Sequence, residues 1–163
     1  MKLSKSVQID SALKDVWRVF SDMSGIVNYH PWVINSPLLS EHNTGKGSSR
    51  RCEFQDNSSI VETITEWREH EYMKMILSET PAPMKSGTVS VYFCSMNGGT
   101  EMTMEMDVKI GLGPIGWIIG PLLIRPLIKN RFEKAILSLD HYIKTGTKFD
   151  PKGNIVDSST AAA

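Results

Sequence analysis

The sequence predicts an α+β fold in which a curved antiparallel sheet of six to seven strands wraps around a long C-terminal helix. Residues 13–20 and 114–144 show the apolar period of amphipathic helices. Between them, residues 32–110 form short segments of alternating apolar and polar character, separated by turn residues. Because the connections are short, successive strands run antiparallel, and the apolar face of their sheet needs a cover. The C-terminal helix is long enough to provide that cover.

The N-terminal part of the chain predicts one strand followed by two short helices. Residues 2–9 partly alternate between apolar and polar side chains, which is typical of a strand with one buried face. Asp10 and Ser11 supply N-cap chemistry for a helix over 13–20. Residues 26–29 form one more helical turn, which ends before Pro31 because a proline disfavours the helical conformation of its predecessor.

Six further strands follow, and the last of them shows which face is buried. We expect them over residues 32–41, 48–55, 59–69, 72–79, 87–96 and 100–110. In the last strand Met102, Met104 and Met106 share one parity, while Glu105 and Asp107 share the other. One face is therefore apolar and the other is hydrated, as in an antiparallel sheet covered on one side.

The C-terminal helix has an apolar stripe that suits this cover. Ile128, Phe132 and Ile136 lie on the stripe, and charged residues occupy much of the remaining surface. Pro126 either kinks this helix or marks its effective start. Gly146 is suited to the C-terminal cap.

Length and composition describe one folded domain. The chain has 163 residues, 18 Lys+Arg against 18 Asp+Glu, and 40% hydrophobic residues. These values argue against intrinsic disorder, and also against a dedicated duplex-DNA binder, which would carry a basic excess. No nucleic-acid partner is therefore expected. We expect a single domain over residues 1–146 and a polar tail over 147–163 that is frayed from 148 onward.

The cysteines, the histidines and the motif content give no support for metal or cofactor chemistry. Cys52 and Cys94 cannot form a disulfide scaffold or a four-cysteine zinc site, so we interpret both as small buried side chains in strands. No two histidines have the spacing of a metal-binding helix, and the sequence contains no nucleotide-binding or nucleophile motif. No metal and no cofactor are expected. Because no signal peptide is visible, we expect a cytoplasmic location.

Several short features between residues 3 and 144 carry a family resemblance. They are Ile9-Asp10-Ser11-Ala12 with Val16-Trp17, Asp22, Trp32 after His30-Pro31, Gly47 before residues 48–51, Val61-Glu62-Thr63-Ile64, and Gly99-Thr100. With the order of elements, they resemble the helix-grip fold of the START-like, Bet v 1-like (SRPBCC) superfamily, above all its polyketide cyclase/dehydrase and lipid-transport branch. This resemblance implies a ligand cavity between the long helix and the inner face of the sheet.

The resemblance also implies which side chains line that cavity. Trp32 is expected near its entrance. The expected lining residues are Arg50, Cys52, Phe54, Ile60, Glu62, Ile64, Met75, Val91, Met102, Met104, Met106, Ile124, Leu127, Ile128 and Phe132. Each apolar member is equally explained as part of the hydrophobic core. Methionines would give the cavity an adaptable wall, suited to varied apolar ligands.

Glu62 is the sharpest polar candidate. If its parity faces inward with Ile60 and Ile64, its carboxylate lies in an apolar cavity, where it could bind a ligand hydroxyl or act as a general acid or base. Arg50 is its candidate partner. The alternative is that Val61, Thr63, Thr65 and Trp67 face inward and leave Glu62 in water. Tyr29 and His30 lie near the expected cavity mouth, where we favour a role in loop packing over catalysis.

Three functions compete. The leading hypothesis is binding or transport of a lipid-like or polyketide-like hydrophobic molecule in the cavity. The second is a cyclase/dehydrase-type enzyme with Glu62 as its acid/base residue, an aldol-type ring closure or dehydration. The third is an interaction module that makes peripheral contact with a membrane through residues 110–128, where an apolar run is followed by basic residues. That run is too short and too rich in Pro and Gly to span a bilayer.

Overall fold

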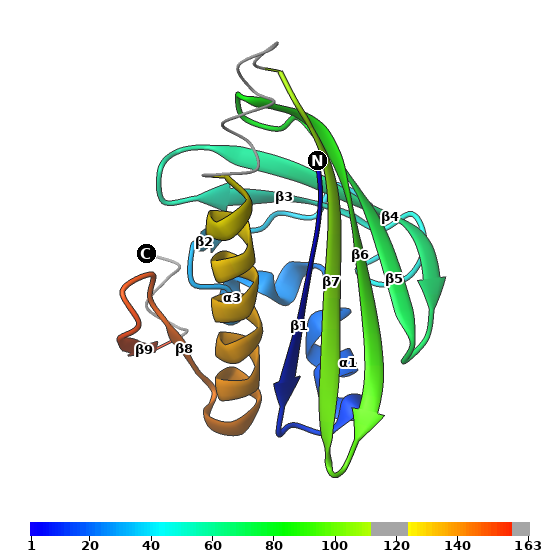
Figure 1. Ribbon diagram of the computed structural model, residues 1–163, viewed down its shortest axis with the longest axis vertical. Helices are drawn as coiled ribbons and strands as arrows, with labels where there is room; N and C mark the ends of the chain where they lie inside the picture. Colours follow the sequence, from blue (N-terminus) through cyan, green and yellow to red (C-terminus); the bar gives the residue numbers. More distant parts are fainter. Residues whose placement is uncertain (112–123, 158–163) are drawn as a thin grey trace.

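The computed structural model describes residues 1–111 and 124–157, and it has the α+β helix-grip architecture expected from the sequence (Figure 1). Its elements in chain order are β1 (Lys2–Ile9), α1 (Leu13–Phe20), the 3₁₀ helix η1 (Ser24–Asn28), β2 (Val33–Asn35), β3 (Ser49–Phe54), β4 (Ser59–Arg68), β5 (Tyr72–Ser78), β6 (Met84–Met96), β7 (Gly99–Ile110), α3 (Arg125–Thr145), β8 (Thr147–Phe149) and β9 (Ile155–Asp157). The predicted order of one strand, two short helices, a series of strands and a long helix is confirmed.

The first seven strands form one antiparallel sheet in the order β1-β7-β6-β5-β4-β3-β2. Strands β2 to β7 pair with their neighbours in sequence, whereas β1 pairs with β7 at the opposite edge. The sheet curls, and α3 packs alongside β1 and covers its concave side (Figure 1). This arrangement places the inner face of the sheet opposite the apolar stripe of α3.

The burial of β7 confirms the predicted parity. Met102 is fully buried, and Met104 and Met106 pack against the core, whereas Glu105 and Asp107 are exposed. Alternation of this kind is what an antiparallel strand with one covered face requires.

Strand β4 changes its inward parity along its length. Ile64 is 1% exposed and belongs to the core. Between Ile64 and Glu66 the pairing with β5 shifts by a β-bulge. Beyond the bulge Trp67 packs against the core, with its ring 4.8 Å from that of Trp17. Because the extra residue of a bulge interrupts the alternation, each of the two parities considered from the sequence is realised in a different half of the strand.

The start of α1 differs from the predicted capping. The N-cap residue is Ala12, and it makes no side-chain cap hydrogen bond. Ser11 instead donates from its backbone nitrogen and its hydroxyl to Asp140 Oδ1, at 3.0 and 2.6 Å. This contact ties the start of α1 to α3, so the hydroxyl serves tertiary packing rather than the helix end.

The described part of the long helix begins at Arg125, with Pro126 in its first turn. A proline is tolerated in the first turn of a helix. Residues 112–123, where the sequence also predicts helix, lie outside the described residues. At the other end Gly146 adopts φ 74°, and its nitrogen donates to the Tyr142 carbonyl, which confirms it as the cap.

Two of the strand boundaries predicted from the sequence are wrong. β2 has three residues, and the chain beyond it contributes only an isolated bridge between Leu38 and Arg50. β6 begins at Met84, three positions before the expected start. Cys94 is exposed in β6, so its predicted burial is also wrong, whereas Cys52 is buried.

The predicted fraying from residue 148 onward is wrong for the described part of this segment. Residues 147–157 fold into the β8–β9 hairpin, which lies beside α3 (Figure 1). The Phe149 ring stacks on His141 of α3, with the centroids 4.5 Å apart. Lys148 is 4% exposed. An aromatic contact and a buried lysine therefore attach this polar segment to the domain.

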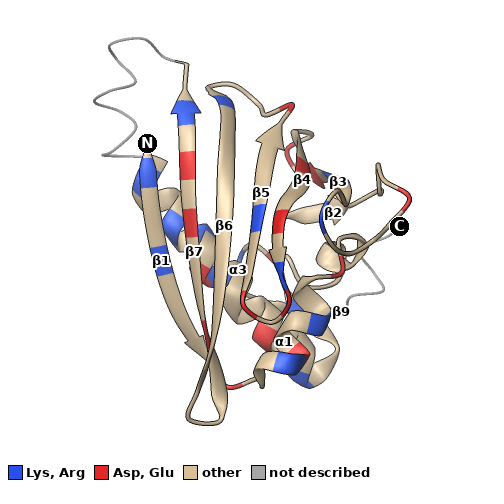
Figure 2. Cartoon of the chain, turned by 90° about the vertical axis from the view of Figure 1, so that its right-hand side faces the viewer, with Lys and Arg blue, Asp and Glu red and all other residues tan. Residues whose placement is uncertain are grey.

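Charged residues of both signs lie on neighbouring strands of the sheet (Figure 2). One example is the ion pair between Lys74 and Glu66, 2.9 Å apart. This mixture matches the zero formal charge of the chain. Among the described residues, no helix has the length and apolar character needed to cross a membrane.

Candidate functional site

A cavity of about 100 Å³ lies between the inner face of the sheet and α3. It is lined by Phe20, Ile26, Tyr29, His30, Arg50, Glu62, Met75, Val89, Met104, Met106, Phe132, Ala135, Ile136 and Leu139. The lining is mostly apolar, and its polar members come from β3, β4 and the residues after η1. The cavity therefore has one polar end and one apolar end.

Two larger depressions lie elsewhere, one of about 400 Å³ beside β1, β6 and β7 and one of about 290 Å³ between α1 and the end of α3. Both are more open to solvent, and polar side chains dominate their linings. An enclosed apolar site is what a hydrophobic ligand needs. We therefore take the smaller cavity as the candidate site.

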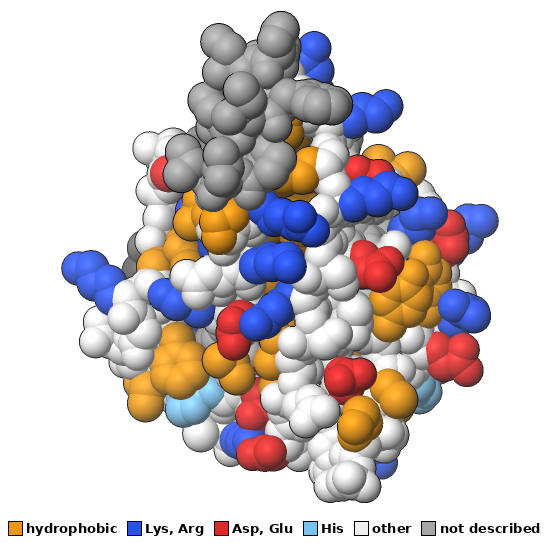
Figure 3. All heavy atoms as spheres, in the orientation of Figure 1, with side chains coloured by type: hydrophobic (Ala, Val, Ile, Leu, Met, Phe, Trp, Pro, Cys, Tyr) orange, Lys and Arg blue, Asp and Glu red, His pale blue; other side chains and the backbone are white. Residues whose placement is uncertain are grey.

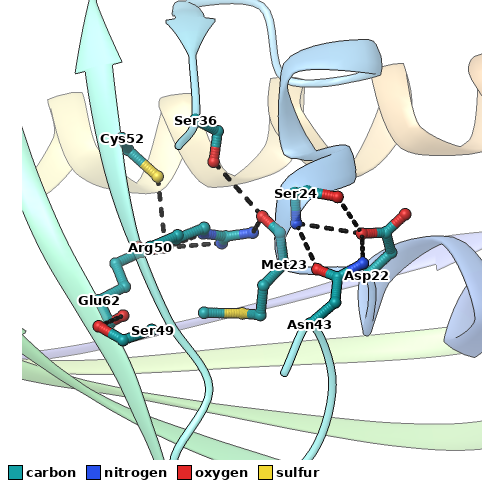
Figure 4. A network of polar contacts seen from close by, with 9 residues as sticks. All are labelled: Asp22, Met23, Ser24, Ser36, Asn43, Ser49, Arg50, Cys52 and Glu62. Carbon is teal, nitrogen blue, oxygen red and sulfur yellow. Dashed lines mark hydrogen bonds and ion pairs between the residues drawn. The ribbon is translucent and has the colours of Figure 1, made fainter. Parts of the chain in front are cut away.

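A buried ion pair forms the polar end of this cavity (Figure 4). Arg50 and Glu62 are opposite each other on β3 and β4. Arg50 Nε and Nη2 lie 2.7 and 2.6 Å from Glu62 Oε2, and Arg50 is 2% exposed. Although burial alone would lower the pKa of the guanidinium, the adjacent carboxylate raises it, so Arg50 stays charged. Glu62 is thus on the inward-facing side of β4.

The remaining donor contact of Arg50 anchors the residue before η1. Arg50 Nη1 donates to the carbonyl of Met23 at 3.0 Å, and Ser36 Oγ donates to the same oxygen at 3.3 Å (Figure 4). The start of η1 is fixed in turn by Asp22, whose Oδ1 accepts from Ser24 and Asn43. Burial opposes ionisation of Asp22, but these hydrogen bonds lower its pKa overall.

Tyr29 and His30, directly after η1, add two neutral groups to the polar end. Burial raises the pKa of Tyr29, so its phenol keeps its proton. Its Oη is buried and has no hydrogen-bond partner among the described residues. Burial, together with the cations Arg50, Lys148 and Arg131, lowers the pKa of His30 to about 3. The imidazole is therefore uncharged at neutral pH, and its Nδ1 accepts from the backbone nitrogen of Trp32.

Cys52 lies beside the ion pair but does not supply a nucleophile. Its Sγ donates to Glu62 Oε2 at 3.5 Å, and burial raises the pKa of the thiol. Because the thiolate is the reactive form, a protonated Cys52 acts as a buried side chain. The site therefore combines a held carboxylate with neutral donors. Such a set can orient a polar ligand group or transfer a proton.

Six of the sequence-predicted site residues line the cavity together: Arg50, Glu62, Met75, Met104, Met106 and Phe132. Four others are buried in the core outside the described cavity lining: Cys52, Ile64, Val91 and Met102. Phe54, Ile60, Ile124 and Ile128 are half-buried and are also outside that lining. Leu127 is 53% exposed, so the expectation that it faces inward is wrong.

Trp32 lies half-buried beside the ring of His30, with the centroids 5.8 Å apart. The Arg131 guanidinium of α3 lies 5.4 Å from the Trp32 ring centroid. This cation–π contact joins the segment after η1 to the cover helix. Trp32 is thus next to a lining residue but outside the described lining itself.

The sequence-based site omitted eight lining residues, and Tyr29 and His30 are the most informative. Both were placed near the cavity mouth, but in a packing role. Their inward position depends on η1, and η1 depends on the distant hydrogen bonds of Asn43 and Arg50. Local spacing carries no signal for such contacts. A metal site gains no support here, because no group of three or more His, Cys, Asp or Glu that could bind a metal ion occurs within the described ranges.

The curled antiparallel sheet with a long C-terminal helix against it is the helix-grip fold of the START-like, Bet v 1-like superfamily. Residues 1–143 match the family described as polyketide cyclase / dehydrase and lipid transport, so the chain belongs to this family. No curated protein matches the sequence significantly.

Similar solved structures agree on the fold. A START superfamily protein from Mycobacterium smegmatis has a TM-score of 0.73 at 16% identity, covering 90% of this chain and 99% of that one. The protein Ara h 8.0201 has a TM-score of 0.71 at 10% identity, covering 89% and 98%. The di-domain ARO/CYC protein BexL, from the BE-7585A biosynthetic pathway, has a TM-score of 0.71 at 8% identity. This match covers 88% of this chain but 46% of BexL.

Proposed function

We propose that this protein binds and carries a hydrophobic small molecule, lipid-like or polyketide-like, in the cavity under α3. The observation that carries the proposal is a mostly apolar cavity, less open to solvent than the other depressions, with the Arg50–Glu62 ion pair at one end. Apolar walls supply affinity, at about 25 cal/mol per Å² of buried apolar area before association costs, and a few polar groups fix the orientation. The family description, which includes lipid transport, supports this function.

The size of the cavity adds a requirement to the proposal. Its volume is about 100 Å³, whereas ligand pockets usually measure roughly 300–1,000 Å³. A ligand must therefore displace part of the wall. Met75, Met104 and Met106 suit this role because their unbranched side chains change rotamer readily. We expect the ligand-bound cavity to be larger than the unliganded one.

A charged substitution in the methionine wall tests the proposal. Met104→Lys should abolish binding of the neutral fluorescent probe N-phenyl-1-naphthylamine, because it places a charge among the apolar side chains that would contact the probe. Met96→Lys is the matched control, since Met96 is exposed at the end of β6. Circular dichroism verifies that both variants fold. Equal probe affinity in folded Met104→Lys and wild-type protein would show that this cavity is not the binding site.

The family description and the likeness to BexL also favour a second function, that of a cyclase/dehydrase-type enzyme. In this alternative Glu62 takes or gives the proton in an aldol-type ring closure or dehydration. Glu62→Gln should then suppress turnover of a poly-β-ketone substrate at least 100-fold while it leaves probe binding largely intact. Full turnover by this variant would eliminate Glu62 as the acid/base residue.

Peripheral membrane contact through residues 110–128 is a further proposal on the same protein. Arg125, Lys129, Arg131 and Lys134 of α3 follow the apolar run, and Lys and Arg side chains gather over this helix in Figure 3. A basic surface next to an apolar segment is what binding to anionic lipids needs. Co-sedimentation with phosphatidylserine vesicles at low salt tests this contact, and an unbound protein would contradict it.

A further inference from the structure

The charged groups in the described cavity lining cancel each other. Arg50 and Glu62 are the charged residues of that lining, and they form one ion pair. His30 is neutral because burial and nearby cations lower its pKa, and Tyr29 keeps its proton. The guanidinium is also occupied on its other side by the Met23 carbonyl. The polar end therefore has no unpaired cation, among the described lining residues, that could bind an anionic ligand.

Two hydrogen-bonding groups at the same end are still available. The Tyr29 hydroxyl is buried, and its charged neighbours are Arg50 and Glu62. Arg50 can only donate, so it provides no acceptor for the phenolic hydrogen. The contacts that Arg50 and Cys52 make with the Glu62 carboxylate all go to Oε2, which leaves Oε1 as an acceptor among the described residues. Tyr29 and Glu62 both line the cavity, so together they offer a ligand one donor and one acceptor.

We infer that the cavity selects its ligand by a neutral hydroxyl group, aliphatic or phenolic, and discriminates against carboxylate and phosphate groups. A hydroxyl both accepts and donates, so a single group can take the Tyr29 hydrogen and give its own to Glu62. An anionic head group can accept from Tyr29, but it has no hydrogen for Glu62 and meets a carboxylate of the same sign. This inference rests on the proposed binding function and adds the chemical class of the ligand.

Two other cations lie near the polar end, but both are occupied. Lys148 Nζ donates to the Val27 carbonyl at 2.7 Å, and to two further carbonyls at longer distances. Arg131 is exposed and lies over the Trp32 ring. Neither residue belongs to the described lining. The ion pair and the two available groups therefore decide the selectivity.

The test compares two probes that differ only in the head group, 1-octanol and octanoate at pH 7.5. Binding is followed by the NMR signals of the methionine methyl groups, since Met75, Met104 and Met106 lie in the cavity wall. We expect 1-octanol to shift these signals with a dissociation constant at least about 10-fold lower than that of octanoate. This ratio corresponds to a difference of about 1.4 kcal/mol in binding free energy.

Two variants assign the selectivity to the named groups. Tyr29→Phe should weaken 1-octanol binding about 5-fold, the loss of one hydrogen bond. Tyr92→Phe is the matched control, because Tyr92 is exposed on the outer face of the sheet. Glu62→Gln should reduce the preference for 1-octanol over octanoate, because the Arg50 guanidinium then has no carboxylate partner and can pair with octanoate. Tyr29→Phe preserves the test if Glu62→Gln fails to fold.

The outcomes separate this inference from the function on which it rests. If octanoate shifts the cavity methyl signals as tightly as 1-octanol, the selectivity is wrong while the binding function stands. If neither compound shifts them in folded protein, the proposed binding function itself fails. If Tyr29→Phe and Tyr92→Phe weaken 1-octanol equally, the assignment to Tyr29 is overturned.

Discussion

Two buried cations hold the two ends of η1, and they do so with different partners. Arg50 is 2% exposed, donates to the carbonyl of Met23 just before η1, and is paired with the carboxylate of Glu62. Lys148 is 4% exposed and donates to the carbonyl of Val27 near the other end. Its further contacts are to the carbonyls of His30 and Val33, at 3.5 and 3.4 Å.

The different partners give the two cations different roles: Arg50 takes part in the polar end of the cavity, and Lys148 positions the residues that follow η1. Arg50 belongs to the part of the chain that matches the family, and its partner faces the cavity. Lys148 lies in the β8–β9 hairpin, beyond the matched residues 1–143, and burial lowers the pKa of its amine. It therefore holds the segment that carries Tyr29 and His30 from outside the cavity. Functional groups and their support thus come from distant parts of the chain.

Breaking the Arg50 contact should have the largest effect. Arg50→Met leaves the Glu62 carboxylate in a half-buried site without its cation, which should lower the free energy of unfolding by about 3–5 kcal/mol. Arg51→Met is the control, because the pair between Arg51 and Glu79 is near the surface and should contribute less than about 1 kcal/mol. Urea denaturation followed by circular dichroism measures both. Similar losses in the two variants would contradict the special role of the buried pair.

Breaking the Lys148 contact should have an intermediate effect. Lys148→Met keeps most of the apolar stem but removes the donor to the three carbonyls, so we expect a loss of about 1–3 kcal/mol in the free energy of unfolding. Lys152→Met, an exposed change in the same hairpin, provides the comparison and should stay within about 0.5 kcal/mol. The same urea titration measures both variants. An unchanged free energy of unfolding in Lys148→Met would show that the hairpin does not support η1.

The smallest expected effect is on the pH dependence of stability. It bears on both cations because burial and then the charges of Arg50 and Lys148 lower the pKa of His30. The pKa of His30 is lowered from 6.5 to about 3, so between these values the unfolded chain binds more protons than the folded one. The contribution of His30 to the free energy of unfolding is therefore fully present above about pH 6.5 and is lost as the pH is lowered. The loss is roughly 1 kcal/mol between pH 7 and 5.5. His30→Gln should reduce the pH dependence of the melting temperature over this range. His42→Gln, a change in an exposed loop, should leave that dependence as it is in the wild-type protein. An unchanged slope in His30→Gln would refute this assignment.

The sequence was sufficient to predict those features that depend on local pattern. The parity of Met102, Met104 and Met106 indicated the inner face of β7, and it was confirmed because alternation in a strand has a fixed period of two. Pro126 lies in the first turn of the described helix, where its missing N–H is tolerated.

Features that depend on register or on distant contacts could not be predicted. The parity of Glu62 was ambiguous because the bulge after Ile64 reverses the alternation within a single strand. Leu127 was placed inward because the helical period does not fix how the first turn of a helix is rotated against its neighbours. The β8–β9 hairpin was missed because its attachment depends on Lys148 and Phe149, one polar and one isolated aromatic residue.

The pairing of β1 with β7 has a consequence for the order of events on the ribosome. The hydroxyls of Ser6 and Thr103 are 2.7 Å apart in the finished sheet but 97 residues apart along the chain. At roughly 5–20 residues per second, β1 is translated about 5–20 s before its partner strand. Strands β2 to β6 can pair as hairpins during that interval, whereas the apolar face of β1 stays in water until β7 has been translated. Of the strands in this sheet, β1 is therefore the one for which nascent-chain protection, by a chaperone or by slow translation, matters most.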